Sequence, residues 1–124
     1  MIIERSIDIE DAVREALKDY LTAYCRPLPK NYQLPCILVS KVGGSDLDKI
    51  DTFDVVLDAR ANTEYEADLT LRNAIGILKA VDGTAIRHVT VNSSGSWGSD
   101  PVRPDLALCS ARLRIVAHVE RATI

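Results

Sequence analysis

The sequence predicts an α+β domain in which two helices cover a mainly antiparallel sheet of four strands. Two segments carry apolar residues at the 3.6-residue spacing of an amphipathic helix, and four segments carry strand patterns. Their order is helix, strand, strand, helix, strand, strand (αββαββ), which predicts two hairpins packed under two helices. The chain has 124 residues, 47% of them hydrophobic, with no recognisable linker. Residues 1–124 are therefore expected to form a single domain.

The first helix is predicted between residues 8 and 24. Its apolar residues share one face and its charged residues share the other. Asp8 is placed to cap the first turn, because its carboxylate can accept hydrogen bonds from free backbone N–H groups. Pro27 and Pro29 cannot continue a helix, so the helix is expected to end near Cys25.

Two strands are predicted next, over residues 34–42 and 52–61. The first contains the continuously apolar run 36–39, which is typical of a strand covered on both faces. The second alternates apolar and polar residues, which indicates one largely polar face. Residues 43–51 between them are polar and begin with two glycines. This segment predicts an exposed hairpin loop.

The second helix begins at a capping box formed by Thr63 and Glu66. In such a box each side chain accepts a hydrogen bond from the backbone N–H of the other residue. The helix is expected to run to about Val81. Asp82 and Gly83 then supply the left-handed conformation that often ends a helix.

The last two strands are predicted over residues 86–94 and 107–121. The second of them shows the clearest period-two alternation in the chain. Residues 93–105 between them are rich in serine, glycine and proline and carry the only tryptophan. They predict a long loop.

The amino-acid composition of the chain argues against several classes of protein. The chain carries 15 Lys+Arg against 18 Asp+Glu, a net charge of -3, which argues against a dedicated nucleic-acid binder. Aromatic residues make up only 5%, which disfavours a ligand-stacking pocket. The three cysteines are widely spaced, so neither a disulfide framework nor a zinc site is expected, and a reducing setting fits best. The acidic start of the chain is unlike a signal peptide, and no apolar run is long enough for a membrane helix.

No catalytic, cofactor-binding or metal-binding residue is predicted. His88 and His118 are the only histidines, and both fall on the more polar faces of their strands. The chain lacks the glycine-flanked serine of a hydrolase, the Walker loop and the spacing of a calcium loop. An enzyme that uses one of these histidines beneath the Trp97 loop stays open as a rival interpretation.

Two features of the sequence are not explained by a generic globular domain: the charged faces of two strands and the single tryptophan. Arginines line one face of the final strand, and acidic residues line one face of the strand at 52–61, so the two faces could pair within the chain or between subunits. Trp97 lies in the long loop, where it either anchors a partner or folds back onto the core. The residues predicted to form the subunit or partner interface are Asp54, Asp58, Trp97, Asp100, Arg103, Arg112 and Arg114.

The order of these features resembles the tail-terminator (tail-completion) proteins of long-tailed bacteriophages and prophages. The resemblance rests on the N-terminal amphipathic helix, the strand 35–39 followed by Gly43 and Gly44, the alternating strand 53–59 and the capped second helix. It continues in the loop 97–101, in Arg103 and Pro104, and in the final strand with its two arginines, and so covers nearly the whole chain. Related neck proteins share this fold.

The resemblance implies a hexameric ring that caps the finished tail tube, stops its polymerisation and offers a surface on which the head docks. The expected partners are further copies of the chain, the major tail (tube) protein and a head-completion or neck protein, with weak DNA contact in the lumen. The chain would then be a minor tail protein of the virion, assembled in the cytoplasm of a bacterial host, with no enzymatic activity and no membrane partner. Another head–tail connector, and an interaction module that never closes a ring, are the remaining alternatives.

Overall fold

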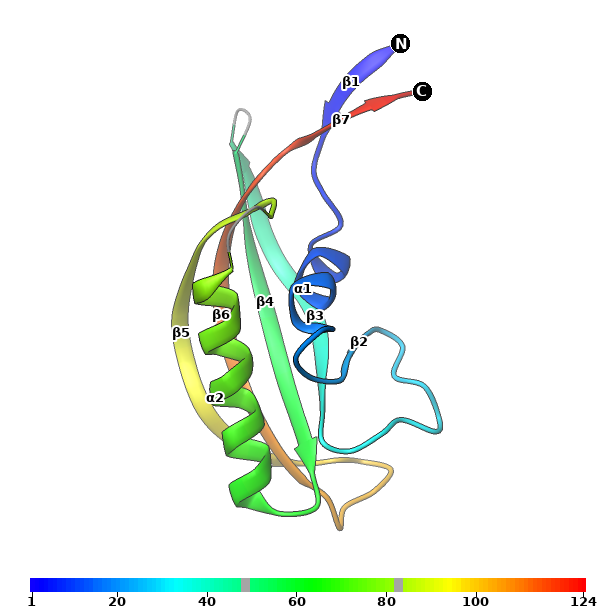
Figure 1. The fold of residues 1–124 in the computed structure, drawn as a ribbon, viewed down its shortest axis with the longest axis vertical. Helices are drawn as coiled ribbons and strands as arrows, with labels where there is room; N and C mark the ends of the chain where they lie inside the picture. The colour runs from blue at the N-terminus through cyan, green and yellow to red at the C-terminus, as the bar shows by residue number, and fades with distance from the viewer. Residues whose placement is uncertain (48–49, 82–83) are drawn as a thin grey trace.

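The computed structural model describes residues 1–47, 50–81 and 84–124 (Figure 1). The strands of this part of the chain form a two-stranded sheet, β1–β7, and a five-stranded sheet in the order β2-β3-β4-β6-β5. The elements are β1 (Ile2–Arg5), α1 (Ile9–Leu17), β2 (Ala23–Cys25), β3 (Cys36–Leu47), β4 (Ile50–Ala61), α2 (Glu64–Ala80), β5 (Ile86–Ser99), β6 (Ala107–His118) and β7 (Glu120–Thr123).

The predicted fold class is wrong. The described residues form a mostly β structure with two helices and seven strands in two sheets, and strands account for about half of them. The strands β1, β2 and β7 have only three or four residues each, too few for a period-two pattern to stand out from chance. In addition, β3, β4 and β5 extend through segments whose composition predicts loops.

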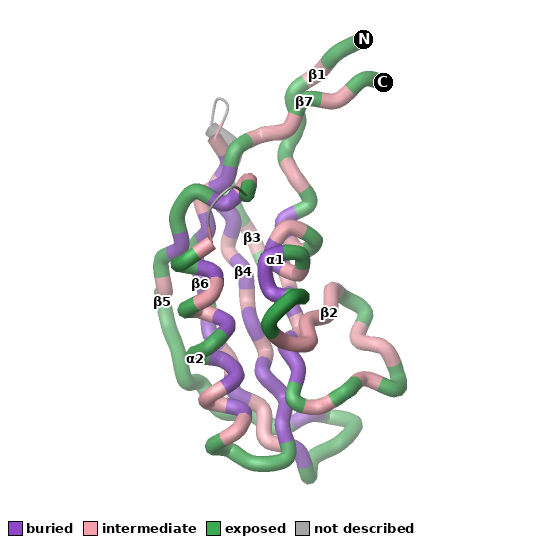
Figure 2. Tube along the Cα trace, viewed as in Figure 1, coloured by how far each residue is buried: buried purple, intermediate pink, exposed green. Residues whose placement is uncertain are grey.

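Both helices lie on the same face of the five-stranded sheet (Figure 1). Alternate residues of β4 and β6 point toward them and are buried, and Figure 2 shows this alternation along β4. Fully buried side chains from both helices and the central strands make one core, because each of these elements is apolar on the side that faces it. The largest of them are Ile9, Leu17, Ile37, Leu57, Leu71, Leu78, Leu113 and Ile115.

The helix α1 begins as predicted but is shorter. An Asp8 carboxylate oxygen accepts a hydrogen bond from the backbone N–H of Asp11 at 3.2 Å, which caps the first turn. The helix ends at Leu17 and not near Cys25, because residues 23–25 pair in parallel with β3. Glu10 on α1 ties the helix to this edge of the sheet, since its carboxylate accepts hydrogen bonds from the Lys41 backbone N–H (3.0 Å) and the Arg26 guanidinium (3.1 Å).

The predicted loop at residues 43–51 belongs largely to a long hairpin. β3 and β4 remain paired through the two glycines as far as Leu47 and Ile50, with a bulge between Lys41 and Gly43. Gly44 has a φ of +153°, and a Cβ there would overlap the Thr52 carbonyl oxygen of the facing strand. Glycine is therefore required where the two backbones approach each other. Residues 48 and 49 of the predicted loop lie outside the described residues.

The helix α2 follows its predicted boundaries closely. The Thr63 hydroxyl oxygen accepts a hydrogen bond from the Glu66 backbone N–H at 3.2 Å, which is one half of the predicted capping box. The helix ends at Ala80, with Val81 in an extended conformation. The predicted stop at Asp82 and Gly83 lies outside the described residues.

The strands β1 and β7 form an antiparallel ribbon that projects from one end of the body (Figure 1). The guanidinium of Arg5 donates a hydrogen bond of 2.7 Å to Glu120 at the base of this ribbon. We call residues 2–5 and 120–123 together the terminal ribbon.

Candidate functional site

The face of the five-stranded sheet that points away from the helices is the candidate interaction surface. Residues on this face are only half-buried or exposed, because no helix covers them. We call it the open face. It is formed mainly by residues of the two central strands, β4 and β6: Thr52, Asp54, Val56, Asp58, Ser110, Arg112, Arg114, Val116 and His118.

The predicted charge pairing across these strands exists at one position. Asp54 stands directly opposite Arg114, and the Arg114 Nε atom lies 3.3 Å from an Asp54 carboxylate oxygen. Asp58 instead stands opposite Ser110, whose hydroxyl donates a hydrogen bond to it. The two acidic residues are therefore satisfied mainly within their own sheet.

Arg112 is the exception on the open face. It is exposed, it stands opposite Val56, and it makes no ion pair with any residue in 1–45, 50–81 or 84–124. An unpaired guanidinium offers five N–H donors to a carboxylate or a phosphate of another molecule. Arg112 is therefore the side chain of this surface best placed to bind a partner.

Asp100 is a buried structural residue. It is 5% exposed, and its carboxylate accepts a hydrogen bond of 2.9 Å from Arg60, itself buried at the end of β4. The backbone N–H groups of Val102 and Arg103 donate to the second carboxylate oxygen at 2.8 and 3.1 Å. These contacts fix the turn between β5 and β6, so Asp100 is not accessible to a partner in this conformation.

Trp97 and Arg103 are accessible, but they lie away from the open-face charges. Trp97 belongs to β5, where it stands opposite Cys109 on the helix side of the sheet and is 50% exposed. The predicted loop at 93–105 is wrong in its first half, because β5 remains paired with β6 as far as Ser99. Arg103 is exposed in the remaining turn, and its guanidinium lies 3.4 Å from Asp105.

The rival enzyme interpretation places a histidine beneath Trp97, but His88 stands opposite Val116, near His118, whereas Trp97 stands opposite Cys109, seven positions further along β6. His88 lines a shallow hollow of about 320 Å³ together with Lys79 and Arg87, and no acidic or nucleophilic side chain of the described residues lines it. His118 lies 3.4 Å from the Arg87 guanidinium. Burial raises the pKa of Cys36 to about 11 and also raises the pKa of Cys109, so both thiols stay protonated at neutral pH.

A second surface feature was not predicted from the sequence. An open groove of about 820 Å³ runs along α2, with residues 20–22 and 33–35 as its opposite wall. We call it the α2 groove. Its apolar lining includes Leu21, Leu34, Leu69 and Ile77. The one sequence signal was Gly76, a glycine within a well-formed helix, where a Cβ would meet nothing within 4 Å.

Within the described residues, no helix is long and apolar enough to cross a membrane, and no group of three or more His, Cys, Asp or Glu side chains is arranged to hold a metal ion. Compared with models of known protein families, the sequence finds no match, and a search among curated proteins finds none either.

Proposed function

We propose that this chain is a structural assembly protein, a ring-forming tail terminator that caps the tail tube of a long-tailed phage or prophage and joins it to the head. The observation that carries the proposal is the open face, on which acidic and basic side chains stand on adjacent strands at fixed spacing. Charges ordered in this way set the register between subunits and discriminate against wrong partners.

A closed ring needs two different surfaces on each subunit, because each copy contacts one neighbour through the first surface and the other neighbour through the second. The unpaired guanidinium of Arg112 supports the open face as one of them. The resemblance of the sequence to tail terminators supports a hexamer. It also supports the tube protein and a neck protein as partners, and the virion tail, assembled in the bacterial cytoplasm, as the location.

We expect DNA to bind this protein only weakly. A subunit with a net charge of -3 binds DNA weakly by itself. In a ring, however, exposed arginines that lie outside the subunit contacts are repeated in every copy and add phosphate contacts, and the sum of these contacts weakens steeply as salt is raised. DNA that passes through such a ring is held loosely enough to move.

The first test is charge reversal at Arg112. We expect Arg112→Glu to place a third acidic side chain beside Asp54 and Asp58 and to weaken self-association by about tenfold or more. Native mass spectrometry over a series of protein concentrations measures this. The control is Lys79→Glu, which makes the same change in net charge on the exposed side of α2. Equal association of both variants and the unchanged chain would contradict a role for the open face.

A further inference from the structure

The terminal ribbon is an element without support from the rest of its own chain. Its two strands pair with each other, and neither has a substantial contact with another element of the described chain. Ile2 is 64% exposed at the tip of the ribbon. A two-stranded ribbon of this length is marginally stable in water unless its apolar face packs against something else. The ribbon therefore requires a surface that the same chain does not provide.

The α2 groove is a surface without an occupant. It is lined by apolar side chains, among them Leu21, Leu34 and Ile77, interspersed with polar and charged ones of α2 and of the segments around residues 22 and 33. Gly76 on this wall costs the helix about 1 kcal/mol relative to alanine. Apart from its chain neighbours and the adjoining backbone of α2, no atom of the described chain lies within 4 Å of the place its Cβ would take. Because residue 76 has no side chain, the groove stays open at this position. The backbone of a second molecule can therefore approach α2 closely there.

One exposed charge on the ribbon and one charge in the groove can form an ion pair, although the groove also contains Arg72, paired with Asp68, and Arg121 stands opposite Glu4 in the ribbon. Arg121 on the ribbon is exposed, and Glu66 lies at the N-terminal end of the groove. Neither residue makes an ion pair with another residue of the described chain. Each therefore retains a charge that a second molecule can pair.

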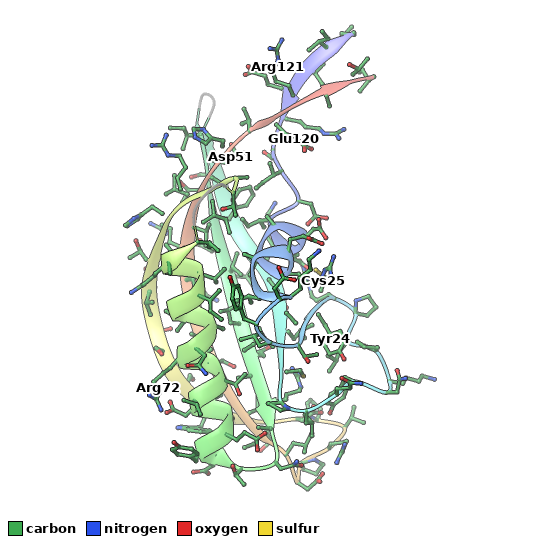
Figure 3. All side chains as sticks on the ribbon, viewed as in Figure 1. Tyr24, Cys25, Asp51, Arg72, Glu120 and Arg121 are labelled. Atoms are coloured by element: carbon green, nitrogen blue, oxygen red, sulfur yellow. The ribbon has the colours of Figure 1, made fainter. Side chains whose placement is uncertain are left out.

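The two surfaces lie far apart on the molecule. Figure 3 labels Arg121 on the projecting ribbon and Arg72, a groove residue, on α2 in the opposite half of the body. We propose that the terminal ribbon of one copy docks in the α2 groove of the next copy, with its Arg121 against Glu66 of that copy. This inference rests on the proposed function in taking a second copy as the partner, and it adds a contact between ribbon and groove to the contact that the open face makes between successive subunits.

The dimensions fit this arrangement. The groove follows α2 from Glu66 to Ala80, roughly 21 Å at 1.5 Å per residue. A four-residue strand spans about 13 Å. One ribbon presents eight residues, whereas a standard interface has about 20–30 residues on each side. A single contact is therefore weak. In a closed ring every subunit makes two such contacts, and together they stabilise the assembly.

Addition of the ribbon to a sheet edge is the competing arrangement. The outer strand β5 shows three shifts in its pairing with β6, and β3 has a bulge after Lys41. Bulges of this kind twist an edge away from further pairing. The structure therefore favours the groove over an added strand.

The test uses two variants of the full chain that break opposite halves of the contact. Ile2→Asp places a charge at the apolar tip of the ribbon, and Gly76→Gln fills the groove with a good helix former. We expect each to weaken self-association by about tenfold or more, as measured by analytical ultracentrifugation up to millimolar protein. Gly76→Gln should also raise the thermal midpoint, which separates blocked docking from damage to the fold. Lys79→Gln, on α2 outside the groove, is the matched control.

Two further experiments test whether the ribbon of one copy meets the groove of the next: mixing of the two variants, and exchange of the charges at residues 121 and 66. An equimolar mixture of Ile2→Asp and Gly76→Gln should stop at dimers, because only one ribbon and one groove remain to meet. Arg121→Glu and Glu66→Lys should each weaken association, and the chain carrying both should regain it. If the single variants assemble like the unchanged chain, ribbon docking is wrong while a ring built on other surfaces survives. If the unchanged chain stays monomeric at millimolar concentration, the docking contact is refuted and ring formation by the isolated chain fails with it.

Discussion

The carboxylate of Asp100 shows how one residue holds the turn between β5 and β6. Burial raises its pKa, but the hydrogen bonds from Arg60 and from the N–H groups of Val102 and Arg103 outweigh burial and hold that pKa below its usual value. A carboxyl with a lowered pKa in the folded state stabilises the fold above its unfolded pKa of about 3.9. That contribution disappears as the pH falls through the folded-state pKa.

We therefore expect Asp100→Asn to reduce the free energy of unfolding by about 3 kcal/mol at pH 7, because the buried Arg60 loses its counter-charge. Urea unfolding followed by circular dichroism from pH 7 to pH 2.5 measures this. The deficit should begin to shrink below about pH 4, where the unfolded-state carboxyl takes up a proton, and should go on shrinking until the pH passes the lowered folded-state pKa and the native carboxyl is neutralised too. The exposed Asp105, replaced by Asn, is the control and should change little. A deficit that does not depend on pH would contradict the ion pair.

Single residues also show the limit of the sequence-based prediction of the site. Alternation assigned Asp54 and Asp58 to the polar face of one strand, and Arg112 and Arg114 to the polar face of another; the structure places the two faces side by side in one sheet. It did not reveal that Arg114 faces Asp54 while Arg112 faces Val56, because the alternation of each strand leaves open which residues stand opposite one another. Asp100 looked like an exposed loop residue because its partner, Arg60, is 40 positions away.

Among the elements, the β3–β4 hairpin departs furthest from its predicted form. Small polar residues at 43–46 are typical of turns, and nothing local in them indicates strand pairing. The hairpin extends because β4 pairs with β6 on its other side along its whole length, which supports its end. The helix α2, whose boundary signals lie within its own residues, was predicted nearly to the residue. The three- and four-residue strands have no such local signal.

The hairpin can be tested at its glycines. We expect Gly44→Ala to destabilise the chain by about 2 kcal/mol, because the positive φ is unfavourable for alanine and the new Cβ overlaps the Thr52 carbonyl. Thermal unfolding of both variants measures the loss. Gly43→Ala is the matched control, since a Cβ there meets Asp54 at an ordinary 3.5 Å. Equal stability of the two variants would show that the strands do not approach each other at Gly44.

At the scale of the whole molecule, the features that favour assembly are those that one chain leaves incomplete. Among the described residues, Arg112 on the open face has no ion-pair partner, no other element packs substantially on the terminal ribbon, and nothing fills the α2 groove. Amphipathic patterns predicted which elements enclose the core, since burial leaves a periodic trace in the sequence. They could not predict the ribbon or the groove, because each is formed by segments far apart in the chain.

The central claim, that the chain ends a growing tail tube, is tested most directly on tubes. A major tail (tube) protein encoded in the same genome as this chain is allowed to polymerise with and without the purified chain, and tube lengths are measured by negative-stain electron microscopy. The account predicts that elongation stops and that a ring of additional density sits at one end of each tube. We expect the Arg112→Glu variant to stop elongation as well, but only at a higher concentration of the variant. Tubes that keep growing with bare ends at saturating concentrations of the chain would contradict the account.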